Sequence, residues 1–255
     1  MNIKINQYFK RRLLNLVKFL VKFVVKISRM ANEVLTKEVL NFLKQLEKNN
    51  NRTWFDEHKT IFKTHENKVK DLYNSVLEGL RATDEIEKLK VFRIYRDVRF
   101  SKDKTPYKIH FAGSFSRTGA KLRGGYYIRI KPGDSFIAAG FWDPNKEDLF
   151  RIRKELELDS EEFRSVIGES SFKKVWGDIT GDELKTAPKG FDKEHENIDL
   201  IRKKQFIFVR KMTDKEVLSP NFVEEVTKSF VAIRPFFDLM SDILTTDLNG
   251  VSLLD

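Results

Sequence analysis

The chain has 255 residues, of which 40% are apolar and 34% charged, with 22 phenylalanines, six prolines and no cysteine. This balance is typical of a globular cytoplasmic protein. It excludes disordered and fibrous chains, disulfide pairing and any chemistry that needs a cysteine. The four histidines form no ligand-spaced motif, and no glycine-rich phosphate loop or dinucleotide fingerprint is present. The sequence therefore predicts no metal site and no cofactor.

Much of the net charge of +10 lies in the first 29 residues, which contain eight basic side chains and no acidic one. Apolar residues recur there at three- and four-residue steps, beside a stripe formed by Lys18, Lys22 and Lys26. This pattern predicts a cationic amphipathic helix on an anionic membrane surface, in a protein that is otherwise cytoplasmic. Two other interpretations stay open: an upstream extension of the reading frame ending before Met30, and a helix packed on the domain.

Residues 30–250 are nearly neutral and show the periodicity of a single α+β domain. The connections between the first four strands are short, which favours an antiparallel meander of about five strands flanked by N-terminal and C-terminal helices. Thr53 is expected to cap the second helix, and Pro235 to kink the last one. The predicted helices cover 36–48, 54–80, 145–157, 160–168, 194–203 and 219–244, and the predicted strands 90–97, 109–115, 126–131, 135–142 and 205–211.

The segment from Arg93 to Lys108 carries six basic residues and only two acidic ones, Asp97 and Asp103. Arginine and lysine side chains in this density, with hydroxyl donors between them, indicate a loop that binds a phosphate or carboxylate. The alternative is a loop in which each aspartate pairs with one arginine. Arg129 on a later strand and Lys189 in a Pro-Gly turn are expected to join the site. The predicted ligand-binding residues are Arg93, Tyr95, Arg96, Arg99, Lys102, Lys104, Tyr107, Lys108, Arg129 and Lys189.

Alternation along the third strand turns Tyr127, Arg129 and Lys131 to one face of the sheet. If this face also carries Arg93 and Tyr95, the sheet can bind a nucleotide or single-stranded nucleic acid by stacking and charge. The alternative is a solvated sheet face without a ligand.

Four other ring-bearing residues are expected to pack rather than to bind. His58 and His65 lie seven residues apart on one helix, too far for a shared metal ion, and are interpreted as hydrogen-bonded residues at the edge of the core. Trp54 and Trp142 are interpreted as packing anchors.

The run from Arg93 to Lys108 also resembles the uncharacterised bacterial and fungal family called domain of unknown function 2461. Further matching segments are 42–55, Gly125–Tyr127 and Ala187–Phe191, so the similarity extends over about residues 37–245. The resemblance implies one structural unit and brings no reaction with it.

The function predicted from these residues is recognition of a phosphorylated small molecule or a nucleic acid by the 93–108 loop. A second hypothesis is an enzyme acting on a phosphorylated substrate, with Asp97 or His195 as the catalytic base. A third is a structural or protein-interaction domain. The sequence does not distinguish these three.

Overall fold

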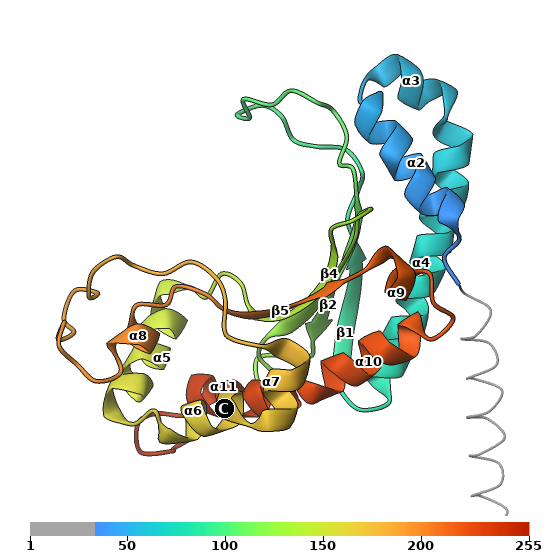
Figure 1. The fold of residues 1–255 in the computed structure, drawn as a ribbon. Coiled ribbons are helices and arrows are strands. Elements are labelled where there is room, and N and C mark those ends of the chain that lie inside the picture. The colour runs from blue at the N-terminus through green and yellow to red at the C-terminus, as the bar shows by residue number, and fades with distance from the viewer. Residues whose placement is uncertain (1–33, 255) are drawn as a thin grey trace, which may run out of the picture.

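The structure, a computed structural model, describes residues 34–254, so the amphipathic helix predicted over residues 1–29 lies outside the described part (Figure 1). The predicted α+β class and the antiparallel meander are confirmed. The helices are α2 Lys37–Lys48, α3 Arg52–Glu57, α4 Lys59–Arg81, α5 Lys146–Leu158, α6 Glu161–Gly168, α7 Ser170–Trp176, α8 Ile198–Ile201, α9 Asp214–Val217, α10 Phe222–Ala232 and α11 Arg234–Thr245. The strands are β1 Ile86–Val91, β2 Phe111–Arg117, β3 Gly125–Ile130, β4 Ser135–Phe141 and β5 Phe206–Met212.

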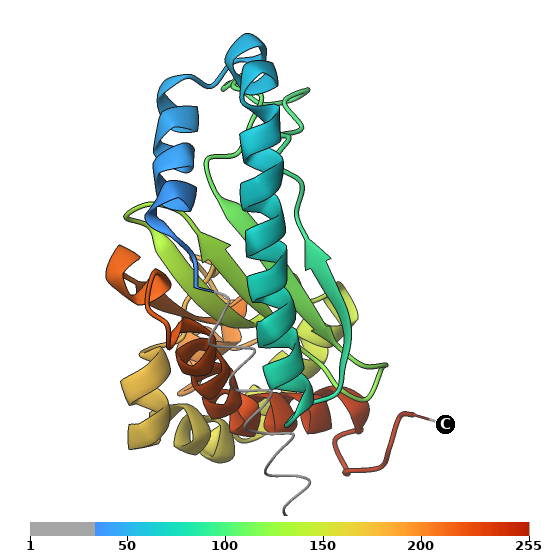
Figure 2. The same ribbon diagram turned by 90° about the vertical axis from the view of Figure 1, so that its right-hand side faces the viewer.

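The five strands follow one another in chain order across a single sheet, and the long helix α4 crosses one of its faces (Figure 2). On this helix-covered face, Phe111 pairs with Ile130 and Phe115 pairs with Tyr126. The ring of Phe115 lies 6.5 Å from Tyr73 of α4, and 6.4 Å from a phenylalanine of α10. Burial of these rings supplies the main apolar stabilisation that holds the helices on the sheet.

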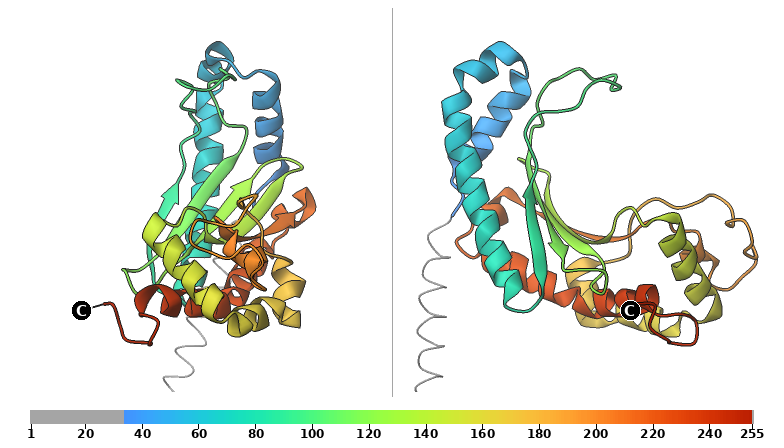
Figure 3. Two further views of the ribbon diagram at one scale, coloured as in Figure 1. Left: turned by 90° about the vertical axis from the view of Figure 1, so that its left-hand side faces the viewer. Right: turned by 180° about the vertical axis from the view of Figure 1, so that it is seen from behind.

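The opposite face of the sheet carries the alternate residues, including Ser114, Tyr127 and Phe136. The β1–β2 connection projects from one end of the sheet, and α5, α8 and the segment before β5 extend from the other end. Both extensions lie on the same side of the sheet, as opposite views show (Figures 1 and 3). They frame an open sheet face between them.

Two predicted elements differ from the observed ones because of local hydrogen bonding. The predicted strand 90–97 ends at Val91, because the register then shifts: Val91 pairs with Gly113, whereas the next pair is the isolated Tyr95–Tyr107 bridge, four residues on along one arm and six along the other. The predicted helix 54–80 is two helices, α3 and α4, and the cap is Asn51 instead of Thr53. The Asn51 side chain accepts a hydrogen bond of 3.0 Å from the Trp54 N–H.

Three further differences concern the second half of the chain. The predicted helix 219–244 is divided into α10 and α11 at Ile233, because Pro235 is accommodated in the first turn of a helix but not in its interior. The helix predicted over 194–203 shortens to the four residues of α8. The short helices α7 and α9 were not predicted.

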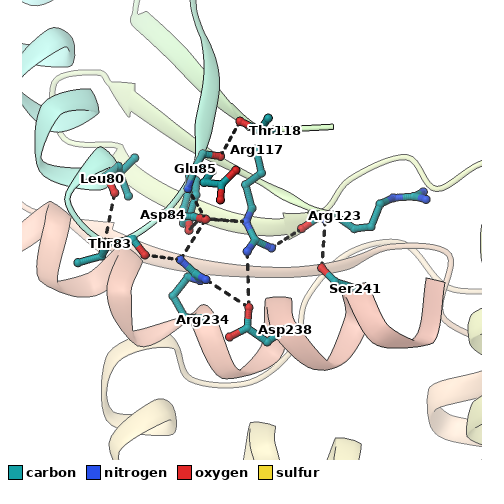
Figure 4. A network of polar contacts seen from close by, with 11 residues as sticks. Leu80, Thr83, Asp84, Glu85, Arg117, Thr118, Arg123, Arg234, Asp238 and Ser241 are labelled. Atoms are coloured by element: carbon teal, nitrogen blue, oxygen red, sulfur yellow. Dashed lines mark hydrogen bonds and ion pairs between the residues drawn. The ribbon is translucent and has the colours of Figure 1, made fainter. Parts of the chain in front are cut away.

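An ion-pair network joins the end of α4, the end of β2 and the start of α11 (Figure 4). The side chains of Asp84 and Arg117 are 1% and 0% exposed, and Arg117 Nε lies 2.9 Å from Asp84 Oδ2. Arg234 Nη1 lies 3.0 Å from Asp84 Oδ1, and the Tyr126 hydroxyl donates to Asp84 at 2.5 Å. One buried carboxylate therefore receives three side-chain donors and ties the helices to the sheet.

Candidate functional site

A hollow of about 550 Å³ lies over the open face of the sheet, between the base of the β1–β2 connection and the start of the chain after β4. Its lining combines aromatic rings with a small number of polar side chains, as in sites for small organic molecules. The lining includes the side chains of Phe92, His110, Ser114, Ser116, Tyr127, Arg129, Phe136 and Trp142.

Four aromatic rings of the hollow come from three strands of the sheet or from the residues directly after them. The ring of Tyr127 lies 6.1 Å from Phe92 and 5.7 Å from Phe136, so three rings form a continuous row across β1 to β4. Trp142, just after β4, is 59% exposed. An exposed tryptophan beside a row of rings offers a surface on which a planar ligand can stack.

Positive charge surrounds one end of this row, around Asp134 in the β3–β4 turn. Arg129 pairs with Asp134, Lys211 Nζ lies 2.9 Å from the same carboxylate, and Lys131 Nζ lies 3.8 Å from it. One carboxylate thus serves three cations. The guanidinium of Arg129 also lies 5.1 Å from the centre of the Phe136 ring, at the hollow. Its positive charge is only partly neutralised, because three cations share the one carboxylate of Asp134.

Two lysines add to this charge at the Phe92 end of the row. Lys90 Nζ and Lys108 Nζ lie 5.2 Å and 5.7 Å from the centre of the Phe92 ring. Burial, Arg93 and Lys90 lower the pKa of Lys108, in that order of importance. Neither Lys90 nor Lys108 pairs with a carboxylate among residues 34–254. An anion bound here would relieve repulsion between neighbouring cations.

The protonation of His110 is affected by these surroundings. Burial, reinforced by Arg129, Lys108 and Lys131, lowers the pKa of His110 from 6.5 to about 4. The imidazole is therefore neutral at neutral pH, with one N–H donor and one ring-nitrogen acceptor. It can contribute both kinds of hydrogen bond to a ligand in the hollow.

The His110 environment predicts a pH dependence of stability. Because the folded pKa is about 4 and the unfolded value is about 6.5, the unfolded chain binds more protons between these pH values. The contribution of His110 to the free energy of unfolding is fully present above about pH 6.5. It is lost as the pH falls toward 4, a decrease of about 2–3 kcal/mol. In urea unfolding, the free energy of unfolding should decrease less for His110→Gln than for the wild type between pH 6.5 and pH 4. Equal losses would contradict a partly buried histidine that is neutral in the folded state.

The tip of the β1–β2 connection is internally bonded, as in the alternative interpretation of the basic segment. Arg96 Nη1 lies 2.5 Å from Asp103 Oδ2, and Arg99 Nη2 lies 2.7 Å from Asp97 Oδ2. Lys104 donates to the Val98 carbonyl, and Lys108 to the Arg93 carbonyl. Hydrogen bonds from Arg99 lower the pKa of Asp97. Within residues 34–254, Arg93 and Lys102 have no carboxylate partner.

The two tyrosines of the basic segment face away from the hollow. Tyr107 is 4% exposed and stacks on Phe55 of α3 at 3.9 Å, and Tyr95 packs against both rings at 5.4–5.9 Å. Asn50 fixes this arrangement by hydrogen bonds to the Tyr107 backbone N–H and C=O. Arg129 and Lys108 are thus the predicted residues that the structure brings to the hollow or its rim.

The remaining predicted residues lie elsewhere. Lys189 and His195 belong to the segment before β5, which packs on α5 through a Phe150–Phe191 ring contact, and the His195 imidazole accepts a hydrogen bond from a backbone N–H at 3.1 Å. His58 bonds the Trp54 carbonyl as expected, whereas the buried His65 Nδ1 has no partner among the described residues. Trp54 packs against the core.

Six of the eight side chains named for the hollow were not predicted: Phe92, His110, Ser114, Ser116, Phe136 and, in this role, Trp142. The interpretation of Trp142 as a packing anchor is wrong, because its ring is exposed at the hollow. Alternation along β4 is the signal that could have identified Phe136. Its position faces the same side of the sheet as Ala138, which pairs with Tyr127.

No helix within residues 34–254 is both long and apolar enough to cross a membrane. Over the same residues, no cluster of three or more histidine and carboxylate side chains is arranged to hold a metal ion.

The family model described as "Conserved hypothetical protein (DUF2461)" matches residues 38–239, most of the chain. The chain belongs to this family. The match includes the strands, the hollow and the basic β1–β2 connection, so the DUF2461 unit contains the whole candidate site. No curated protein and no solved structure matches the chain.

Proposed function

We propose that the open face of the sheet binds a planar molecule that carries a phosphate or carboxylate, of the chemical class of the nucleotides. The observation that carries this proposal is the combination of a row of aromatic rings with Arg129 in one hollow. The anion site was predicted at the loop tip, but two arginines of the tip form ion pairs within the loop. The proposed anion position is therefore the base of the loop and the adjoining sheet.

The size and lining of the hollow support a ligand of this class. A volume of about 550 Å³ falls within the usual range of about 300–1,000 Å³ for small-molecule sites. Phe92, Tyr127 and Phe136 offer ring surfaces of the kind on which nucleobases stack, and such stacking tolerates different bases. The expected ligand places its ring system over this row.

The charge distribution supports an anionic group at the Arg129 end of the row. Arg129 competes with Lys131 and Lys211 for Asp134, and the side-chain N–H of Arg129 Nε is buried without a hydrogen-bond partner among residues 34–254. A guanidinium with a free donor is suited to a phosphate or carboxylate oxygen.

Polar groups between the rings provide contacts for the edge of a heterocycle. Ser114 and Ser116 lie on the same face as Tyr127, and the neutral His110 adds a donor and an acceptor. By contrast, Asp97 and His195, the bases considered for an enzyme, are not part of the hollow. We therefore propose binding and assign no reaction.

The proposal is tested by titrating the full chain with each of the four nucleoside monophosphates and with inorganic phosphate. The chain has three tryptophans, and Trp142 is exposed at the hollow while Trp176 is 2% exposed, so ligand stacking should quench Trp142 fluorescence. Calorimetry on the same samples gives the affinity. At least one nucleotide is expected to bind more tightly than phosphate alone, because stacking adds to the charge interaction.

Two variants separate binding in the hollow from general attraction to a basic protein. Arg129→Met should weaken nucleotide binding about tenfold or more, because it removes a charge-assisted hydrogen bond. Lys68→Met removes the same charge from an exposed position on α4, on the other side of the sheet, and should leave the affinity unchanged. Absence of binding by all four nucleotides at millimolar concentration, or equal weakening by both variants, would overturn the proposal.

A further inference from the structure

The tip of the β1–β2 connection presents a large aromatic side chain to solvent. Phe100 is 98% exposed, more than any other large apolar residue among those described. Its neighbours Arg99, Lys102 and Lys104 are exposed and basic. A fully exposed phenylalanine surrounded by cations is unfavourable to leave in water, and this combination is typical of surfaces that stack on a base and attract its phosphates.

The tip is held in one conformation by its own side chains. Besides its ion pair with Asp103, Arg96 bonds the Thr105 hydroxyl and carbonyl and lies 3.4 Å from Ser101 Oγ. The N–H and hydroxyl of Thr105, and then Arg96, lower the pKa of Asp103 to about 2, so its carboxylate stays charged at all physiological pH values. Because these bonds order the turn in advance, less conformational entropy is lost when a ligand binds there.

The charge of this segment remains positive after its internal pairs are formed. Asp97 and Asp103 are bonded within the tip, and the stretch from Arg93 to Lys108 keeps a net charge of +4. Lys108 at its base is beside the Phe92 ring of the hollow. Basic side chains thus lead from the hollow along the connection to Phe100.

The position of the tip determines the length of ligand that can reach both places. The connection projects away from the sheet on the side of the open face (Figures 1 and 3). Phe100 follows Phe92 by eight positions, a path of at most about 29 Å. Because the tip projects from the sheet that carries Phe92, Tyr127 and Phe136, we expect a ligand of several linked nucleotides, and not a single nucleotide, to contact both places.

Resting on the proposed function, we infer that the ligand is single-stranded nucleic acid, with one base in the hollow and a following base on Phe100. The rings of the two places supply stacking, and the basic connection between them follows the phosphates. The positive charge of the connection is complementary to the phosphates of this polymer. A lipid surface is also anionic, but it has no bases that could stack on the row of rings in the hollow.

The inference is tested with the full chain, using fluorescence anisotropy for an end-labelled oligouridylate of about twelve nucleotides and calorimetry for UMP. Phe100→Ser should weaken oligonucleotide binding about five- to tenfold or more, because one base loses its stacking partner, and should leave the affinity for UMP unchanged. Ile61→Ser is the matched control, since it removes an exposed apolar side chain from α4 and should change neither affinity.

Each outcome has a defined meaning. An oligonucleotide affinity no higher than that of UMP, or one unaffected by Phe100→Ser, overturns the inference while leaving the proposed function intact. Failure of all four nucleoside monophosphates to bind overturns the proposed function. An oligonucleotide that then still depends on Phe100 has its contacts on the tip alone, and this overturns the inference of a base in the hollow as well. Binding of phosphatidylglycerol vesicles that Phe100→Ser abolishes, without an effect on the oligonucleotide, assigns the tip to a membrane surface and also overturns the inference.

Discussion

Replacement of Asp84 by asparagine is expected to lower the free energy of unfolding by about 3–5 kcal/mol. The Asp84 side chain is 1% exposed and accepts from Arg117, Arg234 and Tyr126. The variant removes the charge that compensates Arg117, which is itself fully buried, and an uncompensated buried guanidinium is costly. The expected loss corresponds to a decrease of roughly 6–20 °C in melting temperature for a chain of this size.

Asp238→Asn provides the matched control for this prediction. Asp238 belongs to the same network, 3.5 Å from Arg117 Nη2, but its side chain is 57% exposed (Figure 4). Solvent screens such a pair, so the variant should lose less than about 1 kcal/mol. Thermal and urea unfolding of both variants test the comparison. Similar stabilities of the two variants would contradict the view that burial of the Asp84–Arg117 pair makes it indispensable.

Gly140→Ala is expected to cost about 3–5 kcal/mol and to disturb the pairing of β4 with β5. Gly140 has a φ of +137°, and an added Cβ would lie 2.2 Å from the Phe206 carbonyl oxygen and 2.8 Å from Ile207 Cα. Both contacts are backbone atoms of the neighbouring strand, so no side-chain rotation relieves them. The strand itself must move. Because Gly140 also lines the hollow, the variant should weaken nucleotide binding as well.

Gly133→Ala separates backbone strain from steric overlap. Gly133 also has a positive φ, +69°, but an added Cβ would meet no atom within 4 Å. This variant should therefore lose only about 1–2 kcal/mol, from the left-handed conformation alone. Denaturant unfolding measures both losses, and a Gly133 variant as unstable as the Gly140 variant would mean that conformation, and not the contact with β5, decides the effect.

The described part of the fold followed from its sequence wherever one periodicity persisted over a whole element. Alternating apolar residues predicted β3 and β4, and the apolar spacing along 36–48 predicted α2, because burial of one face requires a constant period. The interruptions were less predictable. The end of the β1–β2 ladder after Val91 depends on a shift of register between the two strands, and register is a property of pairing across the sheet.

For the candidate site, the sequence determined that Tyr127 and Arg129 share a face, since alternation along one strand is a local property. It also located the positive charge of the 93–108 segment. Which of these cations are free was decided by tertiary contacts. Asp97 and Asp103 each select one arginine through the turn of the loop, while Tyr107 is drawn into the core by Phe55.

Only the tertiary structure assembled the hollow. Phe92, His110, Phe136 and Trp142 lie on or next to three different strands, and none of them has a sequence neighbour that marks it as a binding residue. Strand register brings Phe136 beside Tyr127, and burial, together with the nearby cations of other segments, lowers the pKa of His110. Periodicity reports how a segment faces the core, whereas a site on an open sheet is made by register between strands, which is set by the packing of the opposite face.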